Sequence, residues 1–334
     1  MSSVQIALPN GQQYDQRTGA FINNEFVPAT GEAFDEIDPS EADVNKAVAA
    51  ARTAFQGNSR SLSATERGNL LSRLAELIYR DRELFAAIDA YDNGKLYSVT
   101  LAAHLDESYD VFKYYAGWAD KSSGKTIETS SGKLAYVLQE PLVAPALACG
   151  NVVVLKPAEQ TPLSALYLGK LVIEAGLPPG VVNIIHGLGP VAGRCLAEYT
   201  EVDKIAFTES TATGRTIMKA PATNLKNITL QLGSAMLGLW IIRGKLDEGV
   251  YDAFVSRFVE VTRENAGAMI GRAVVEGAYQ GPQLSRGQYE KVLEYIELEK
   301  NEGADLVYGG MRHGEKGYFV EPTAFAKLSC WFPS

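Results

Sequence analysis

Cysteine and histidine are scarce in this chain of 334 residues, which contains three of each. Cys149, Cys195 and Cys330 are odd in number and far apart, so they lack the paired framework of a secreted, disulfide-stabilised domain. A reducing compartment is therefore expected, with the cytoplasm as the default. The three histidines form no closely spaced cluster with one another or with cysteine, so no metal site is expected.

Long apolar runs and blocks of basic charge are also missing. The most apolar stretch, residues 142–155, is too short to span a bilayer and is interrupted by Pro145, Gly150 and Asn151. The first fifteen residues have neither the basic nor the apolar part of a signal peptide, so none is expected. Lys and Arg number 31 against 40 Asp and Glu, a net charge of −9, which disfavours nucleic-acid and anionic-membrane partners.

What the chain does contain is the composition of a globular protein. Hydrophobic residues make up 46% and charged residues 21%, which excludes a disordered or fibrous chain. At this length we expect roughly two domains or one large one. The first third predicts a short strand pair over 21–27 and a helix over 41–55. A capping box at Ser63 and Glu66 predicts a helix that runs to Asn93, and a further helix is expected over 99–121.

From residue 151 onward, short apolar runs alternate with helical segments. This alternation predicts βαβ units, hence an α/β fold with a parallel sheet and a ligand site at the carboxyl ends of its strands. The expected strands are 152–155, 181–185, 204–207 and 227–232, and the expected helices are 162–175, 191–198, 214–219, 251–265 and 285–301.

Two local motifs are candidates for nucleotide binding. The string GLGPVA at 187–192 has the G-x-G-x-x-A form of a dinucleotide fingerprint and follows a predicted strand. Pro190 and the lack of a suitable acidic residue downstream favour a plain turn as the alternative. Lys156 and Glu159 follow the first parallel strand, where they either hold ribose hydroxyls or lie in a solvated loop. Cys149 and Cys195 are expected to be small buried hydrophobes rather than nucleophiles.

Four longer strings resemble the aldehyde dehydrogenase superfamily, particularly its fungal NAD-linked members, and the resemblance extends from about residue 19 to 325. They are VFKYYAGWADK at 111–121, VLKPAEQTPLSAL at 154–166, EAGLPPGVVN at 174–183 and GYFVEPT at 317–323. The resemblance implies a Rossmann-like parallel-sheet dinucleotide-binding domain, a catalytic domain and an oligomerisation hairpin, assembled as dimers or tetramers. It also implies a nicotinamide nucleotide and a small aldehyde as ligands. The family reaction converts an aldehyde and NAD to a carboxylic acid and NADH.

Matched to this family, residues 1–121 and 140–233 form the NAD-binding domain, 122–139 the oligomerisation hairpin and 234–334 a remnant of the catalytic domain. Lys156 and Glu159 match the pair that holds the adenosine ribose, and Gly187 and Gly189 match the turn beside the adenine. The family string F-T-G-S-T-x-x-G stands here as FTESTATG at 207–214, which keeps its cofactor-binding residues Ser210, Thr211 and Gly214.

Glu209 replaces the first glycine of that string. If its carboxylate pointed at the pyrophosphate, two like charges ~4 Å apart would repel by about 4 kcal/mol at an effective dielectric constant of about 20. The alternative is a side chain that turns to solvent and costs only backbone strain. NAD is therefore the expected cofactor, weakened by Glu209.

The residues that carry the family's chemistry are absent. Gln231 stands at the position of the general-base Glu, and an amide cannot take a proton from water. The segment with the oxyanion-binding Asn should lie between Pro141 and Ala144, where the flanks are almost fused. Residues 234–250 contain no nucleophilic Cys. A family strand is missing after Ser40. The chain also stops before the family's E-E-I-F-G-P-V string, so Cys330 falls where the resemblance has ended.

These losses predict an aldehyde dehydrogenase-like protein that is catalytically impaired or dead, that is, a pseudoenzyme with no catalytic residues. Two alternatives remain open: a non-catalytic partner subunit of a full-length aldehyde dehydrogenase, and the product of a decayed or wrongly assembled gene.

Overall fold

The computed structural model describes residues 3–8, 11–28, 41–121, 143–220, 224–232, 248–274, 277–278 and 280–326. The chain divides into two compact units. Unit 1 comprises Met1–Ile88 and Leu101–Ser234, and unit 2 comprises Asp89–Thr100 and Ala235–Ser334. The expected oligomerisation hairpin at 122–139 and the position of the missing strand after Ser40 lie outside, or at the border of, the described residues.

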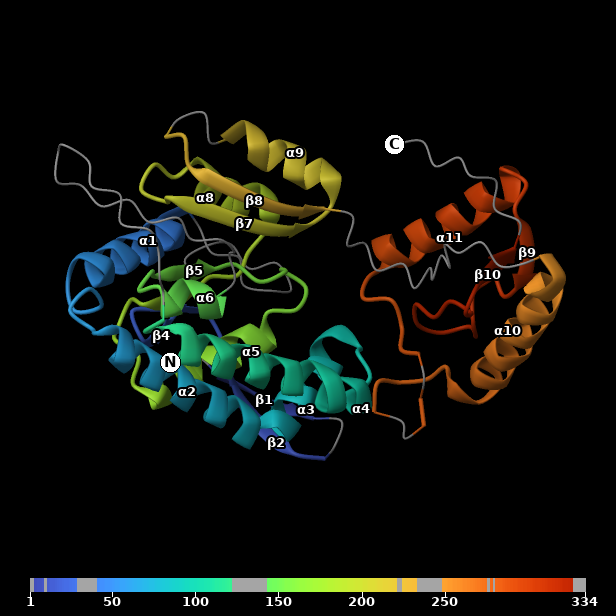
Figure 1. Cartoon of the computed structure of the whole chain (residues 1–334), viewed down its shortest axis with the longest axis horizontal. Helices are drawn as coiled ribbons and strands as arrows, with labels where there is room; N and C mark the ends of the chain where they lie inside the picture. Colours follow the sequence, from blue (N-terminus) through green and yellow to red (C-terminus); the bar gives the residue numbers. More distant parts are fainter. Residues whose placement is uncertain are drawn as a thin grey trace. The chain divides into compact units, whose positions relative to one another are not determined.

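Unit 1 contains most of the strands (Figure 1). They are β1 (Ser3–Ala7), β2 (Gln13–Arg17), β3 (Ala20–Ile22), β4 (Glu25–Val27), β5 (Val153–Leu155), β6 (Val182–Ile184), β7 (Lys204–Glu209) and β8 (Asn227–Leu232). Its helices are α1 (Glu41–Gln56), α2 (Ala64–Arg80), α5 (Leu105–Trp118), α6 (Val143–Ala148), α7 (Leu163–Ala175), α8 (Arg194–Glu198), α9 (Thr211–Lys219) and the π-helix η2 (Gly189–Gly193). Helix α3 (Arg82–Asn93) and the π-helix η1 (Thr100–His104) each begin in one unit and end in the other. Unit 2 adds α4 (Tyr97–Val99), α10 (Glu248–Met269), α11 (Arg286–Asn301), β9 (Asp305–Tyr308) and β10 (Ala324–Ala326).

The strands of unit 1 form separate sheets. A four-stranded sheet has the order β4-β3-β6-β5, in which β5 and β6 are parallel and β3 is antiparallel to both β4 and β6. Strands β7 and β8 form a second, two-stranded parallel sheet with α9 packed on it (Figure 1). The predicted parallel pairing is thus confirmed, but no described strand joins β5 to β7. In a doubly wound sheet of order 3-2-1-4-5, the pair β6–β5 would take positions 3 and 2, and the pair β7–β8 would take positions 4 and 5. A central strand, position 1, would then lie between them.

The core of unit 1 holds the loop that follows β6, where the candidate site begins. Val44, Ala47 and Val48 of α1 are buried against Ile185 and Ala192, as the periodicity of 41–55 predicted. Because Ile185 ends the β6 run and Ala192 lies on η2, the α1 face holds the loop between them in place. Burying these aliphatic side chains stabilises the arrangement by about 1.5–3 kcal/mol for each large one.

Two helix predictions need correction. The helix expected from Ser63 to Asn93 begins with the predicted capping box, in which the Ser63 amide donates to Glu66 Oε2 at 2.8 Å. It breaks at Asp81, however, which ends α2 with its own amide bonded back into the last turn. The Asp81 carboxylate accepts a 2.6 Å bond from the Tyr167 hydroxyl of α7, so a tertiary contact coincides with the break. The helix expected over 99–121 starts as the π-helix η1 and is α-helical only from Leu105.

Some strands were not predicted from the sequence, and one helix begins at a different residue than predicted. The hairpin β1–β2 and the pair β9–β10 were not predicted, because short strands of mixed polarity lack the alternation used to find them. Helix α9 begins three residues earlier than expected. Its N-cap is Ser210, whose hydroxyl accepts from the Thr213 amide at 3.3 Å.

The Asp81 site makes the stability of the fold dependent on pH. Hydrogen bonding to Arg80, and secondarily to Tyr167, lowers the pKa of Asp81 despite partial burial. A lowered folded-state pKa adds stability that is present above the unfolded value, about 3.9, and lost as pH falls through the folded value. Asp81→Asn should therefore cost about 1–3 kcal/mol of unfolding free energy at pH near 7 and much less at pH near 3. Urea denaturation at both pH values measures this, and an equal cost at both would contradict it.

Candidate functional site

Lys156 and Glu159 form an ion pair at the carboxyl end of β5. Lys156 Nζ lies 3.3 Å from Glu159 Oε2 and donates to the Pro157 carbonyl at 3.0 Å. The Lys156 side chain is 15% exposed and that of Glu159 is 39% exposed, so the lysine is held in place while the carboxylate faces outward. Lys156 is thus a largely buried, paired lysine, and its expected role toward ribose hydroxyls stays a prediction.

The glycine-rich loop after β6 runs beside this pair. A Cβ built at Gly193, at the end of η2, would lie 3.8 Å from both Cδ and Cε of Lys156, so the lysine stem crosses the last turn of η2. A Cβ built at Gly189 meets no atom within 4 Å. The backbone there is open to the approach of a ligand, as expected of a glycine in a dinucleotide turn. Gly187 precedes it, directly after His186, which is 5% exposed.

A second group of predicted residues lies at the start of α9. Ser210 caps the helix, and its Oγ is 2.9 Å from Thr213 Oγ1. Thr211 is the first helical residue and is exposed, while Gly214 is buried one turn later. The first amides of a nine-residue helix point at this end and favour an anion.

Gln231 lies next to this second group. It pairs in register with Thr208 across the β7–β8 ladder, and Thr208 Oγ1 lies 3.5 Å from Gln231 Oε1. The side chain is exposed and ends in an amide, which has no titratable proton. Glu209 follows Thr208 as the last residue of β7 and immediately precedes the Ser210 cap.

The predicted site residues therefore fall into two groups on two sheets. Lys156, Glu159, Gly187 and Gly189 belong to the β5–β6 end, which we call the ribose end. Ser210, Thr211, Gly214 and Gln231 belong to the β7–β8 end, which we call the phosphate end. Sequence reasoning missed Gly193, although a third glycine just beyond the G-x-G-x-x-A motif is a signal that could have found it.

The cysteines differ from expectation in one case. Cys149 is exposed, not buried, because it lies at the turn after α6. Cys195 is half-buried on α8, and burial raises the pKa of its thiol, followed by the nearby Glu41 and Glu198 carboxylates. A raised pKa lowers the thiolate fraction, so Cys195 is a poor nucleophile.

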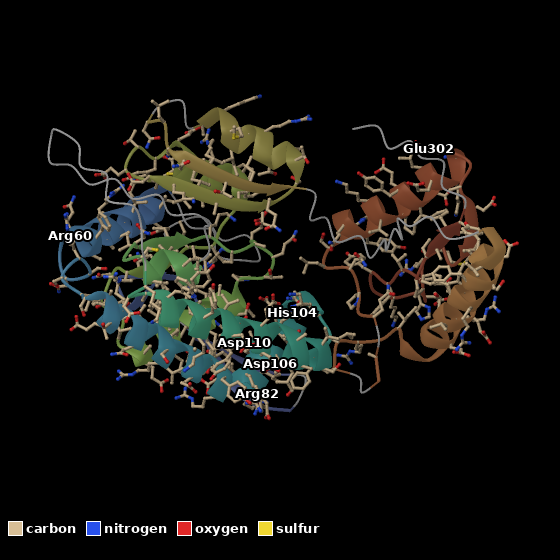
Figure 2. The ribbon with its side chains drawn as sticks, viewed as in Figure 1. Arg60, Arg82, His104, Asp106, Asp110 and Glu302 are labelled. Atoms are coloured by element: carbon tan, nitrogen blue, oxygen red, sulfur yellow. The ribbon has the colours of Figure 1, made fainter. Side chains whose placement is uncertain are left out.

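Neither a metal centre nor a membrane-spanning helix is found in the described part of the chain. His104 is exposed on η1, with Asp106 and Asp110 on the following helix (Figure 2). Within the described residues, no group of three or more His, Cys, Asp or Glu side chains is placed to hold a metal ion. Every helix among these residues is too short or too polar to span a bilayer.

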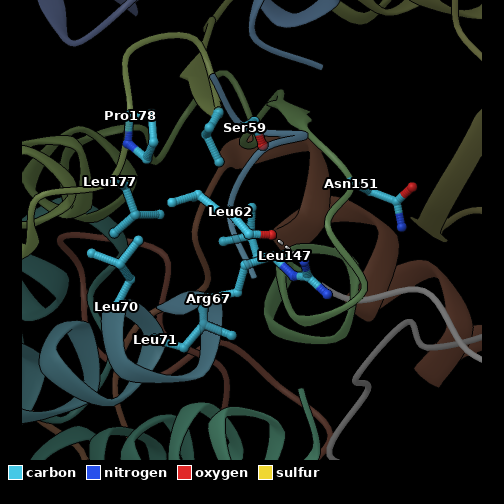
Figure 3. Close-up of a pocket in the computed structure, with 10 residues that line it drawn as sticks. Ser59, Leu62, Arg67, Leu70, Leu71, Leu147, Asn151, Leu177 and Pro178 are labelled. Atoms are coloured by element: carbon cyan, nitrogen blue, oxygen red, sulfur yellow. Dashed lines mark hydrogen bonds between the residues drawn. The ribbon is translucent and has the colours of Figure 1, made fainter. Parts of the chain in front are cut away.

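A small cavity of about 20 Å³ lies under the start of α2 (Figure 3). Arg67 crosses it, donating from Nε to the Ala148 carbonyl at 3.0 Å and from Nη1 to the Leu62 carbonyl at 2.8 Å. Leu70, Leu71 and Leu147 are among the apolar residues that line it. The space fits about one water molecule, and none of the predicted site residues lines it, so it is a packing feature of the fold.

A family model described as "Aldehyde dehydrogenase family" matches residues 20–143, 142–237 and 242–330, which is most of the chain. The chain belongs to the aldehyde dehydrogenase family. An aldehyde dehydrogenase of Davidiella tassiana is 40% identical over 98% of this chain and 78% of its own length, and one of Aspergillus niger is 40% identical over 97% and 76%. The expected fungal resemblance is thereby confirmed.

Solved aldehyde dehydrogenase structures share the fold. The NAD+ complex of the Bacillus cereus enzyme is 36% identical, with a TM-score of 0.82 over 94% of this chain and 76% of that one. A Gly-to-Asp mutant of the same enzyme gives a TM-score of 0.83 at 35% identity. The alignment with the Davidiella enzyme spans 389 positions, more than the 334 residues of this chain. That relative therefore carries residues that this chain lacks inside the aligned region.

Proposed function

We propose that this chain is a NAD-binding member of the aldehyde dehydrogenase family that does not oxidise aldehydes. NAD binding is supported above all by the Lys156–Glu159 pair. Its lysine is largely buried and lies against η2 at the carboxyl end of a parallel strand. In that place the ammonium and the outward-facing carboxylate are suited to bonding the two hydroxyls of a ribose.

The remaining residues of the site also fit NAD. The open backbone at Gly189 leaves room for the adenosine to approach, and the capped start of α9 supplies amides for the pyrophosphate. When bound, NAD supplies a hydride acceptor in the family reaction. Here Lys156 and Glu159 orient the ribose. Ser210 caps α9 by accepting from the Thr213 amide, which fixes the helix end whose other amides face the phosphates. Glu209, the residue before that cap, adds a carboxylate that either faces the phosphates and repels them or turns to solvent.

The absence of chemistry is supported by the sequence and by where the family match breaks. Gln231 cannot act as the general base, and residues 234–250 contain no cysteine. The family match breaks at residues 142–143 and again between 237 and 242, the two regions where the oxyanion Asn and the nucleophile are expected. The first break also precedes β5, whose sheet is not continued to β7 by any described strand.

The alternative of a non-catalytic partner subunit rests on the expected hairpin at 122–139 and remains a prediction, as do the domain boundaries, the oligomeric state and the cytoplasmic location. A small aldehyde remains a ligand only by family. Co-expression with a full-length relative, followed by size-exclusion chromatography, separates a free chain from a mixed assembly.

Thermal unfolding with and without millimolar NAD tests the proposal directly. NAD should raise the midpoint of a cooperative transition, because a ligand that binds only the folded state stabilises it by mass action. A midpoint that NAD leaves unchanged contradicts nucleotide binding. A chain with no cooperative transition would support a decayed or wrongly assembled gene product instead.

Lys156→Ala should abolish most of that midpoint shift. The substitution removes a charged hydrogen-bond donor from the ribose end, and such bonds contribute about 1.5–3 kcal/mol, so the Kd for NAD should rise roughly tenfold to a hundredfold. Lys113→Ala is the matched control, since it removes the lysine of the Lys113–Glu76 pair, 3.0 Å apart on α5 and α2. Equal losses of affinity in both variants, measured by titration calorimetry, would rule out a specific role for Lys156.

A further inference from the structure

The two ends of the proposed nucleotide site are linked by a loop rather than by a sheet. We call residues 197–203, the end of α8 and the connection from it to β7, the loop. Within it, Tyr199 and Val202 pack half-buried against the core cluster of α1, Ile185 and Ala192. The closest packing of β7, β8 and α9 is with one another. Since no described strand joins β5 to β7, the loop and its partners fix the phosphate end relative to the ribose end.

Lys226 provides the most buried of these contacts. It is 7% exposed, and its Nζ donates to the carbonyl oxygens of Ala197 at 2.8 Å and Tyr199 at 2.5 Å. These carbonyls belong to the last turn of α8 and the residue that caps it, where backbone acceptors lack partners within the helix. Burial lowers the pKa of Lys226, with partial compensation from Asp203.

Two further side chains bind the same loop. Asn224 Nδ2 donates to the carbonyls of Thr200 at 2.6 Å and Val202 at 3.2 Å. Arg52 of α1 donates to the Glu201 carbonyl and to Asp203 Oδ2, the latter at 2.6 Å. We call Lys226, Asn224 and Arg52 the loop clamp.

The backbone between the two clamp residues that precede β8 is strained. Leu225 has a φ of +56° and is 90% exposed, an unusual conformation and environment for a leucine. Such a conformation persists only where its surroundings enforce it. On either side of it, Asn224 and Lys226 both donate to the loop.

We propose that Lys226 is a positioning residue of the nucleotide site. Through its contacts to the loop, Lys226 fixes the position of the phosphate end relative to the ribose end. This inference rests on the proposed binding of NAD. A ligand that contacts one end only does not depend on how the two ends are placed relative to each other. NAD contacts both ends at once and therefore does depend on it. The hydrogen bonds of Lys226 go to the loop carbonyls rather than to either group of candidate ligand-binding residues.

The test compares NAD with adenosine, which occupies the ribose end alone. In Lys226→Met, the Kd for NAD by titration calorimetry should rise roughly tenfold, whereas the adenosine affinity by ligand-observed NMR should change less than about twofold. Lys219→Met is the matched control, because this exposed lysine lies at the far end of α9. It should leave both affinities as they are in the wild type. A general loss of structure would weaken both ligands together.

Each other outcome overturns the inference. The inference is contradicted if Lys226→Met leaves the NAD affinity unchanged, or if it lowers the adenosine affinity in parallel. It is also contradicted if the wild type binds NAD but not adenosine. If the wild type binds neither ligand, the proposed function itself fails. Should Lys226→Met lose its cooperative unfolding transition, Asn224→Ala and Arg52→Met carry the same expectation, since both side chains are more exposed members of the loop clamp.

Discussion

Purified protein should form no NADH from acetaldehyde and NAD above the uncatalysed rate. Under the proposed function, this chain lacks counterparts of the family's nucleophile, general base and oxyanion Asn. The nucleophile and the Asn act together when the thioester forms, and the base acts when it is hydrolysed. In the protease subtilisin, removal of the nucleophile alone lowers kcat by about 10⁶-fold. NADH absorbance should therefore rise at least about 10⁶-fold more slowly than with a full-length relative, such as the Aspergillus niger enzyme, assayed in parallel.

Two variants make this result informative. Gln231→Glu restores the family's base and should still give no turnover, because the segment expected to hold the nucleophile, residues 234–250, contains no cysteine to form the acyl-enzyme that the base hydrolyses. Cys149→Ser removes the exposed thiol and should change nothing. Turnover in the wild type that disappears in Cys149→Ser would show that an unrecognised nucleophile acts, and would refute the proposed loss of chemistry.

Glu209→Gly should strengthen NAD binding by about tenfold or more. Glu209 ends β7 and directly precedes the cap of α9, where the proposed pyrophosphate lies. Two like charges ~4 Å apart at an effective dielectric constant of about 20 repel by about 4 kcal/mol, which bounds the gain at about a thousandfold. Titration calorimetry of NAD at low and high salt measures both the gain and its electrostatic origin.

Glu209→Gln separates charge from backbone freedom. It keeps the size of the side chain and removes only the charge, so it should recover most of the affinity gained by Glu209→Gly. If Glu209→Gln binds NAD no better than the wild type, the carboxylate points to solvent, and the alternative of a purely conformational cost is correct. Adenosine binding should be the same in all three proteins.

Local patterns predicted the elements of the site well. The strands around Lys156 and Gly187 were found because their β-branched runs are bounded by turn residues, and the capping box at Ser63 was found because its two residues satisfy each other. The strings that resemble the family then predicted roles for residues whose local sequence patterns alone indicated no clear function. The split of the parallel strands into two sheets was not predicted, because pairing depends on contacts distant in sequence.

The loop clamp could not have been predicted from the sequence. A lysine before a strand is usually a solvated charge, and nothing near Lys226 in the sequence marks it as buried. Its partners are the backbone carbonyls of Ala197 and Tyr199, far back along the chain, and carbonyls carry no sequence signal. The exposure of Cys149 was missed for a similar reason, since burial of a small residue at a turn depends on what packs over it.

The separation of β5–β6 from β7–β8 changes what a binding constant means for this protein. In a continuous sheet, the two ends of a dinucleotide site are fixed before the ligand arrives. Here the loop clamp, and not a sheet, sets that arrangement. Under the proposed function, the apparent affinity for NAD is therefore the intrinsic affinity multiplied by the fraction of molecules in which the clamp contacts are made. Under the proposed function, the free energy of NAD binding then contributes to the assembly of unit 1, in addition to the contacts of the loop clamp.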